Sequence, residues 1–212
     1  TTSTSIFFGY QAGNVGTAGY SQAIGLGSNA LDALTTGDYN IGIGEAAGGA
    51  LTTGHTNIAI GRGAMDAMVG GNTNIGIGLN TLGLSQNSSA NIAIGESAIA
   101  AAVVTGDENI GLGKESLTNL TSGTHNIALG STAFGGLTTG GYNVAIGSGA
   151  AGAGAHEGTD NVFIGRQAGK ATTRTSGSVY IGHKAGQNHT TAGHANVAIG
   201  SGSMGIANQT IG

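Results

Sequence analysis

The chain has 212 residues, of which 44 are Gly; 8% are charged, 4% are aromatic, and Pro, Cys and Trp are absent. Disordered chains combine low hydrophobicity with high net charge, whereas 39% of these residues are hydrophobic and the formal net charge is −4. The composition therefore argues against disorder and favours an ordered structure that uses Gly at regular turns.

Three further classes of protein are disfavoured. The 6 Lys and Arg residues are scattered between Arg62 and Lys184, so no basic cluster indicates a nucleic-acid partner. The absence of Cys rules out disulfides and thiolate metal sites and leaves the compartment open. The run "AIAAAVV" at 98–104 is shorter than the roughly 18 residues of a membrane span, so we expect no membrane insertion. The chain starts at Thr1 without a signal segment, and we interpret it as a processed part or fragment of a longer fibre.

A short motif recurs along the whole chain. It reads N-[IV]-x-[IL]-G-x-x-A, followed by an apolar residue, two small or polar residues, another apolar residue and a polar turn often spelled TTG; "NIALGSTAFGGLTTGGY" at 126–142 is the clearest copy. Its period is near 17 residues, which indicates a solenoid of stacked coils. In chain order, the Gly that closes each copy is expected at Gly9, Gly25, Gly44, Gly61, Gly78, Gly95, Gly113, Gly130, Gly147, Gly165, Gly182, Gly200 and Gly212.

The start of each copy has the pattern of a β-strand. Ile58 and Ile60 alternate with Asn57, Ala59 and Gly61, and alternation of period two places the two kinds of residue on opposite faces. We therefore predict one all-β domain over 1–212, a parallel β-solenoid of about 12 coils of about 17 residues with two short strands per coil. The large aliphatic residues are expected to fill the core: Ile41, Ile43, Ile58, Ile60, Ile75, Ile77, Ile92, Ile94, Ile110, Leu112, Ile127, Leu129, Val144 and Ile146.

The first position of the motif predicts a polar ladder. Identical amide side chains stacked coil upon coil hydrogen-bond along the stack. The expected ladder consists of Asn40, Asn57, Asn74, Asn91, Asn109, Asn126, Asn143, Asn161 and Asn196, with Ser5, Ser21 and Ser178 in the same slot of other copies.

One thin coil does not bury enough apolar surface to be stable alone. Ordering 17 residues costs about 25 kcal/mol, whereas the apolar residues of one coil return roughly 6 to 10 kcal/mol. The third position of the motif is nearly always Ala or Gly, which lets another backbone approach closely. We therefore expect the face formed by the third positions to contact a second chain.

Three copies depart from this rule together. They have an aromatic residue at the third position, Phe7, Phe163 or Tyr180, and Gly where other copies have a large aliphatic residue after the Ala. An exchange of volume between the two positions would keep the total packing volume constant. The aromatic side chains are thus predicted to lie either between chains or in a second core region shared by the third and ninth positions.

The motifs "NVAIGSGA" at 143–150 and "NVAIGSGS" at 196–203 resemble the repeats of trimeric autotransporter adhesin heads. The stretches "FGYQAG" at 8–13 and "LTTGDYNIGIGEAAGGALTTGHTNIAIG" at 34–61 are similar to tandem repeats of phage tail-fibre proteins. The resemblance covers essentially the whole chain. It implies a left-handed parallel β-roll, three chains that are intertwined or packed side by side, and a place in a virion tail or on a cell surface. The coil here is longer than in adhesin heads, and we expect no C-terminal chaperone or membrane anchor within these 212 residues.

The sequence offers little for catalysis. The string "GIGEAAG" at 42–48 recurs with the coil and lacks the helix and acidic residue of a dinucleotide-binding fingerprint. Acidic residues at 105–109 and 158–161 are too sporadic for a calcium-binding roll, and no spacing of the 6 His indicates zinc. We expect no enzyme activity, no catalytic residues, no cofactor and no metal.

The sequence favours a structural or adhesive segment of a fibre. We expect this segment to associate with itself as a homotrimer and to bind a glycan or protein on the surface of a host cell. The varied outer turns provide the candidate receptor-binding residues Tyr20, Tyr39 and Tyr142. A self-assembling extracellular filament joined end to end remains an alternative, because solenoids without polar caps stack. An ice-binding solenoid is a further alternative, based on the Thr pairs 35–36, 52–53, 138–139 and 190–191.

Overall fold

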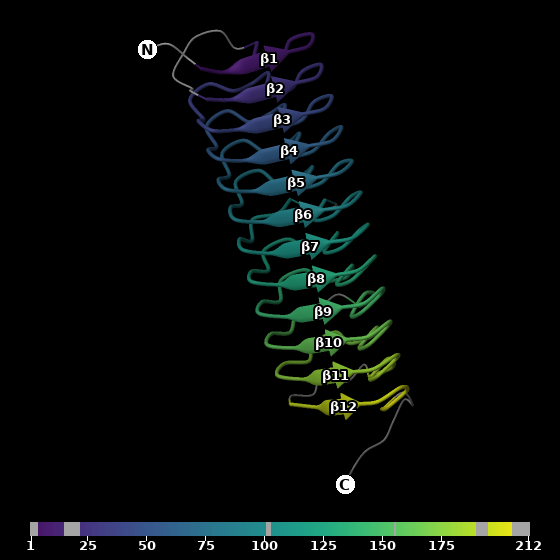
Figure 1. Ribbon diagram of the computed structural model, residues 1–212. Helices are drawn as coiled ribbons and strands as arrows, with labels where there is room; N and C mark the ends of the chain where they lie inside the picture. Colours follow the sequence, from purple (N-terminus) through teal and green to yellow (C-terminus); the bar gives the residue numbers. More distant parts are fainter. Residues whose placement is uncertain (1–3, 15–21, 101–102, 155, 190–194, 205–212) are drawn as a thin grey trace.

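The computed structural model is a slender stack of coils that follow one another in chain order (Figure 1). It describes residues 4–14, 22–100, 103–154, 156–189 and 195–204. These residues form a parallel β-solenoid with 12 strands in one sheet, in the order of the sequence. The strands are β1 (Ile6–Phe8), β2 (Ile24–Leu26), β3 (Ile41–Ile43), β4 (Ile58–Ile60), β5 (Ile75–Ile77), β6 (Ile92–Ile94), β7 (Ile110–Leu112), β8 (Ile127–Leu129), β9 (Val144–Ile146), β10 (Val162–Ile164), β11 (Val179–Ile181) and β12 (Val197–Ile199).

Equivalent residues of successive coils lie in register, as the repeat predicts. Ile58 pairs with Ile75, which pairs with Ile92. At the spacing of about 4.8 Å between paired strands, the stack is roughly 53 Å long. The in-register columns make each kind of side chain continuous along the stack.

Each coil contains one strand, so the second strand expected per coil is wrong. Beyond the named strands, the described residues have a single isolated bridge, between Leu137 and His156. The rest of each coil consists of turns that still bond to the next coil, for example from the N–H of Leu31 to the carbonyl of Ala47 at 3.0 Å. Positive φ angles, such as 54° at Ala46, interrupt extended geometry there.

The register of the second copy differs from the expectation. β2 aligns Phe8 with Leu26, so Gly27, not Gly25, closes this copy. Gly25 lies in the middle of the strand, and Ala23 occupies the ladder slot that we expected to contain Ser21, which lies outside the described residues, as does Gly212. The first spacing is therefore 18 residues.

Gly ends each strand because the corner excludes a side chain. Gly44 has φ of 129°, and a Cβ atom built there would lie 2.7 Å from the carbonyl carbon of Gly61 in the next coil. A residue with a Cβ would both strain the backbone and collide with the neighbouring coil. The corner glycines therefore hold the coils at their close spacing.

The large aliphatic residues of the strands face outward, which corrects the predicted core. The middle residue of every strand from β2 to β12 is buried, whereas its flanking residues are half-buried or exposed. Every aliphatic residue predicted to fill the core is on the outer face: Ile41, Ile43, Ile58, Ile60, Ile75, Ile77, Ile92, Ile94, Ile110, Leu112, Ile127, Leu129, Val144 and Ile146. The third positions, which we expected to contact a second chain, point into the coil instead.

The reason is the volume available inside a narrow coil. Large side chains from the turn half already fill it, and all of them are almost completely buried: Leu31, Leu34, Leu51, Met65, Met68, Leu82, Ile99, Leu117, Leu120, Phe134 and Leu137. These side chains leave room only for Ala or Gly on the strand that faces them. The core is therefore made of one small layer and one large layer.

The aromatic exceptions belong to this interior. Phe163 and Tyr180 are completely buried, Phe7 is partly buried, and the rings of Phe163 and Tyr180 lie 5.5 Å apart between centroids. A Cβ atom at Gly186 would lie 2.6 Å from the Tyr180 ring, so the aromatic side chain occupies the space above the Gly of its own coil. The third and ninth positions thus share one buried region.

One copy has small residues, Gly42 and Gly48, at both the third and the ninth positions. A side chain from another coil fills the interior space beside them. A Cβ atom at Gly42 would lie 2.8 Å from Cγ of Leu31, and one at Gly48 would lie 2.7 Å from Cδ2 of the same side chain. Leu31 comes from the preceding coil. Packing volume is therefore kept constant between coils as well as within them.

The Asn column forms a continuous buried ladder. Oδ1 of Asn40 accepts hydrogen bonds from the backbone N–H of Asn57 at 2.9 Å and from its Nδ2 at 3.2 Å. Nδ2 of Asn57 also donates to the carbonyl of Gly71 at 2.7 Å. The same pattern runs through the remaining members: Asn74, Asn91, Asn109, Asn126, Asn143 and Asn161.

Hydroxyl groups replace the amide near both ends of the ladder. Oγ of Ser5 accepts from the N–H of Ala23 at 3.1 Å, and Oγ of Ser178 accepts from the N–H of Asn196 at 3.2 Å. The ladder continues across coils of 18 residues, as between Asn91 and Asn109. Coil length therefore varies in the turns without disturbing this column.

His156 is a titratable group buried in the core. His156 has no exposed surface, and its ring contacts those of Phe134 and Phe163 at centroid distances of 5.7 and 5.2 Å. Nε2 lies 2.8 Å from Oγ1 of Thr172, which itself donates to the carbonyl of Gly169. The hydroxyl therefore accepts from Nε2, and Nδ1 is without a partner among the described residues. Burial lowers the pKa of His156 from 6.5 to about 4.

We predict that Phe163→Ala lowers the free energy of unfolding by about 3 to 5 kcal/mol because it leaves a cavity. Gly169→Leu should restore part of that loss in the double variant, since Leu82 and Leu117 occupy the equivalent slot at φ of 50° and 51°. The measurement is denaturant unfolding of the wild type, both single variants and the double variant. Gly169→Leu alone should be destabilising because it collides with the Phe163 ring.

We predict a second effect from His156. Because its pKa is lower in the folded state, the unfolded state binds the extra proton first. The contribution of neutral His156 to the free energy of unfolding is thus fully present above pH 6.5. It falls by about 3 kcal/mol as the pH drops from 6.5 to about 4. His156→Leu, which places the residue type of Leu137 in the slot, should remove this part of the pH dependence. The prediction is contradicted if the free energy of unfolding changes by the same amount in both proteins between pH 7 and 4.

Candidate functional site: an exposed isoleucine face and its borders

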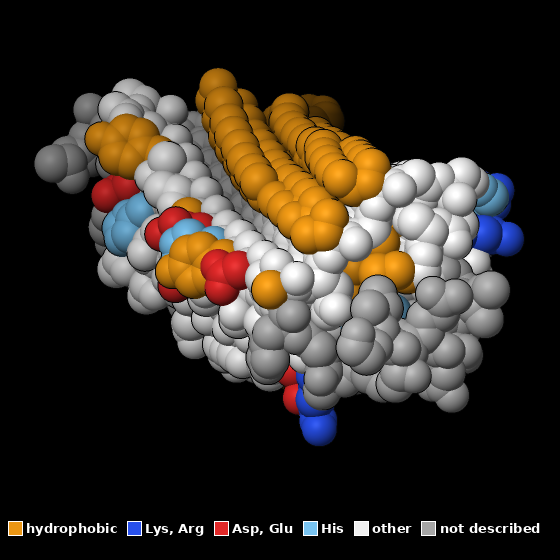
Figure 2. Space-filling model, turned by 90° about the horizontal axis from the view of Figure 1, so that it is seen from below, with side chains coloured by type: hydrophobic (Ala, Val, Ile, Leu, Met, Phe, Trp, Pro, Cys, Tyr) orange, Lys and Arg blue, Asp and Glu red, His pale blue; other side chains and the backbone are white. Residues whose placement is uncertain are grey.

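Two parallel ridges of apolar side chains run along one face of the molecule (Figure 2). They are the first and third residues of strands β1 to β12, and we call this surface the Ile face. Ile94 and Ile146, in the middle of the stack, are 39% and 36% exposed. The other central members are half-buried because the equivalent residues of adjacent coils cover their flanks.

The size of this face sets it apart from ordinary surface hydrophobic residues. A length of about 53 Å and a width of about 10 Å give roughly 500 Å². The largest contiguous apolar patch on a typical monomer measures about 300 to 600 Å², and such patches commonly mark interaction sites. The Ile face is therefore the strongest candidate for a functional surface in the described structure.

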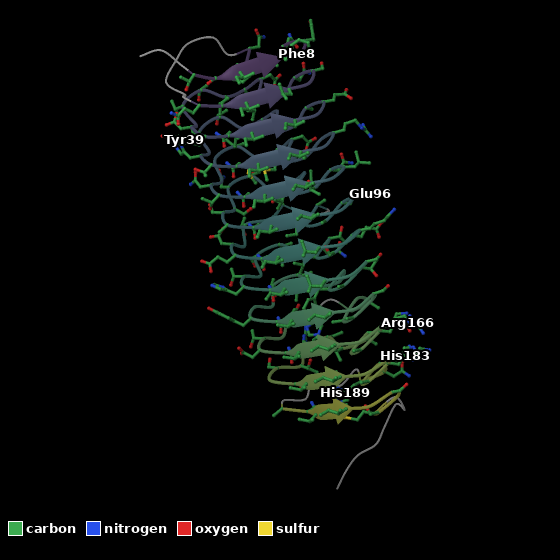
Figure 3. All side chains as sticks on the ribbon, in the orientation of Figure 1. Phe8, Tyr39, Glu96, Arg166, His183 and His189 are labelled. Atoms are coloured by element: carbon green, nitrogen blue, oxygen red, sulfur yellow. The ribbon has the colours of Figure 1, made fainter. Side chains whose placement is uncertain are left out.

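The Ile face has two borders, at opposite ends of the strands. The corner row is the residue just before each ladder position and includes Tyr39; the glycine row is the residue just after each closing Gly and includes Glu96, Arg166 and His183. Figure 3 shows Tyr39 on one side of the strands and the three glycine-row residues on the other. Every described residue of the corner row is exposed, and so is the glycine row except at Ser28, Leu79 and His183, which are half-buried.

The corner row contains two of the predicted receptor-binding residues. Tyr39 and Tyr142 are 56% and 60% exposed, whereas Tyr20 lies outside the described residues. The ring of His125 stacks on that of Tyr142 at 4.6 Å between centroids and 12° between planes, and Nε2 of His125 lies 2.9 Å from Oε2 of Glu108. Three consecutive coils thus combine an acid, an imidazole and a phenol in one exposed line.

The glycine row contains most of the bordering positive charge. Nζ of Lys114 lies 3.1 Å from Oε2 of Glu96. Nη2 of Arg166 donates to Nε2 of His183 at 2.7 Å, so the imidazole accepts and is neutral in this contact. In the part of the chain that the structure describes, Arg166 forms no ion pair with a carboxylate.

A groove of about 440 Å³ lies outside the Ile face, on the turns after the closing glycines. Leu84 gives it an apolar wall, and burial raises the pKa of Asp66. Its full lining is Asp66, Asn80, Gly83, Leu84, Ser97, Ala100, Glu115 and Thr118. The mixture of hydroxyl, amide and carboxyl groups around one aliphatic side chain suits a hydroxyl-rich ligand.

The Thr pairs do not form one uniform surface. Oγ1 of Thr35 donates to the carbonyl of Thr52 at 3.0 Å, and Oγ1 of Thr52 donates to that of Val69 at 3.2 Å. The first Thr of a pair is therefore engaged between coils. Thr190 and Thr191 lie outside the described residues.

Two features are absent from the ranges that the structure describes. These ranges contain no group of three or more His, Cys, Asp or Glu side chains arranged to hold a metal ion. They also contain no helix of the length and hydropathy needed to cross a membrane.

Comparison of the chain with protein-family models, with curated proteins and with solved structures finds no significant match. Its function must therefore be inferred from the geometry of the surface.

Sequence reasoning identified the residues of the Ile face but assigned them to the interior. It also missed the line formed by Glu108, His125 and Tyr142, although the regular spacing of 17 residues already places these three in adjacent coils. A signal for the outward face was present: the slots that contain Leu or Met in the turn half already provide a large residue for the core of nearly every coil.

Proposed function

We propose that the chain is a non-enzymatic structural and adhesive segment of a fibre, in which copies associate through their Ile faces and the outer surface contacts a cell-surface receptor. The observation that carries this proposal is a long, continuous apolar face on a rod whose own core is already filled. Covering that face on every copy gives the apolar burial that one thin coil lacks.

The area of the Ile face fits association of copies of this chain. Together with its borders it approaches the roughly 800 Å² that each partner buries in a standard interface. The face is straight and repeats with the coil, so an identical rod has a matching spacing along its full length. The repeat's resemblance to adhesin heads and tail fibres favours three copies in a virion tail or on a cell surface.

The alternative of an end-to-end filament joins coils through their open edges and leaves the Ile face uncovered. For this reason we favour lateral association. An ice-binding role would need a uniform outer array, and the interrupted Thr pairs support it less well than the continuous Ile face supports assembly.

We predict that Ile77→Lys/Ile94→Lys converts the assembly to monomers, because it places two charges in the centre of the apolar contact. The wild type should sediment at about three times the chain mass of 20.4 kDa. The control Thr53→Lys adds one charge to an exposed turn and should leave the mass unchanged. Circular dichroism of each variant checks that the coils persist, and a wild type that is monomeric at all concentrations would refute the proposal.

For the adhesive part, we assign receptor contact to the groove at Asp66 and Leu84 and to the solvent-facing edge of the corner row, where Tyr39 and Tyr142 lie at the outer rim of the Ile face. Tyr142 with stacked His125 provides a flat ring beside hydrogen-bonding groups, an arrangement suited to the apolar face of a sugar or to a protein side chain. The partner is a host glycan or protein.

Tyr39→Ala/Tyr142→Ala should reduce binding of the labelled protein to host cells by roughly tenfold or more, since buried aromatic contacts dominate many interfaces. Leu84→Asp tests the groove in the same assay. Both variants are compared with the wild type at a concentration where sedimentation shows that they assemble, because Tyr39 and Tyr142 border the Ile face, whereas Leu84 lies in the groove outside it. Unchanged cell binding by all of these variants would refute these receptor contacts.

A further inference from the structure

The two borders of the Ile face carry charges that match coil by coil. In the coil of β7, the corner row has Glu108 and the glycine row has Lys114. In the coil of β10, they have Asp160 and Arg166. These are the acidic residues of the described corner row, and each has a basic residue across the face at the same level.

No coil places like charges at its two borders. Glu45, Arg62 and Glu96 in the glycine row lie at the levels of Tyr39, Thr56 and Ala90 in the corner row. Within one chain the Ile face separates the two rows, and Figure 3 shows them on opposite sides of the strands. The match therefore serves no contact between the rows of the same rod.

From this match we infer that neighbouring copies associate in parallel and in register, with the corner row of one copy against the glycine row of the next, so that Asp160 pairs with Arg166 and Glu108 with Lys114 between chains. We call the line where the two rows meet the seam. The inference rests on the proposed association through the Ile face and specifies the orientation of neighbouring copies, their relative height along the rod and the contacts at the seam. The partner is a second copy of this chain.

The geometry of rotational symmetry requires this meeting of unlike rows. When copies surround an axis parallel to the rod, with Ile faces inward, each copy presents one border to one neighbour and the other border to the next. Equivalent coils then lie at equal height. An antiparallel pair brings each row against itself instead, and Asp160 would then face a row that contains no Lys or Arg among its described members.

The local surroundings of these charges support a partner outside the chain. Asp160 and Arg166 form no ion pair with any described residue of their own chain. Glu108 contacts His125 at 2.9 Å, and Lys114 contacts Glu96 at 3.1 Å, through side chains that remain 59% and 53% exposed. Complementary charges at the rim of an apolar contact fix register and orientation.

The test is charge exchange in the coil of β10. Asp160→Arg and Arg166→Asp should each raise the concentration at which the assembly half dissociates by about tenfold, because every seam loses one attraction and gains one repulsion. The double variant Asp160→Arg/Arg166→Asp restores opposite charges across each seam and should return to within about threefold of wild type. Sedimentation over a concentration series measures all four proteins.

A matched control uses an ion pair that is made within one chain, away from the borders. Nε of Arg174 lies 3.0 Å from Oε2 of Glu157. Glu157→Arg changes the charge by the same amount as Asp160→Arg and should leave the half-dissociation concentration unchanged. An equal effect of the two substitutions would show that net charge alone acts and would overturn the inference.

Cross-linking gives a readout that does not depend on stability. The chain contains no Cys, so Tyr142→Cys/Ser148→Cys, at the two borders of the β9 coil, places one thiol on each side of every seam. A short bismaleimide should join these chains into closed covalent rings, whereas Tyr142→Cys alone should give no cross-link. The variant Tyr142→Cys/Glu45→Cys, with thiols six coils apart, is the control for register and should not cross-link between chains.

The outcomes separate the inference from the function on which it rests. Assemblies that form normally, but in which the double charge exchange is no better than the single variants, would overturn the seam and leave the Ile-face proposal standing. Cross-links from Tyr142→Cys alone would show an antiparallel arrangement and also overturn the seam. A wild type that never assembles would refute the Ile-face proposal itself.

Discussion

Parallel stacking at one fixed spacing governs every other feature of this protein. Each coil repeats the hydrogen-bonding groups of the one before it, so a side chain that bonds along the stack does so in a continuous column. The buried Asn ladder is the strongest expression of this constraint: one amide accepts from the backbone and side chain of the next Asn, and its own Nδ2 bonds the corner carbonyl. Because buried polar groups need partners, interruption of this column leaves several groups unpaired at once.

The same constraint explains how the molecule divides its apolar residues. Since a narrow coil holds one large layer, the Leu and Met residues of the turn half exclude the strand aliphatics from the interior. The Ile residues accumulate instead as two columns on a flat outer face. The features that stabilise the single rod thus also create the surface through which we propose that rods associate, and the border charges give that association a direction.

The sequence was sufficient to predict the solenoid, its period, the first strand of nearly every coil and the Asn ladder, because these depend on repetition alone, but the second strand expected per coil is absent from the described residues. It was not sufficient to orient the strands. Alternation in Ile75, Gly76 and Ile77 separates two faces but does not say which is inside; that depends on whether Leu82 already fills the coil. The second copy shows a similar limit, since both Gly25 and Gly27 fit the motif and only pairing with β1 selects Gly27. The exchange between Phe163 and Gly169 was predictable because it conserves volume.

The corner glycines have a consequence for how such a rod changes length. Each corner glycine from Gly9 to Gly182 contacts the backbone of the adjacent coil so closely that a substitution at a single corner is disruptive. A whole unit, however, brings its own Gly, its own Asn and its own layer of core side chains. Duplication or deletion of complete units therefore preserves all neighbouring contacts, and the distance between the two ends of the rod changes in steps of about 4.8 Å. The number of units therefore sets the length of the rod, at a spacing that the backbone fixes.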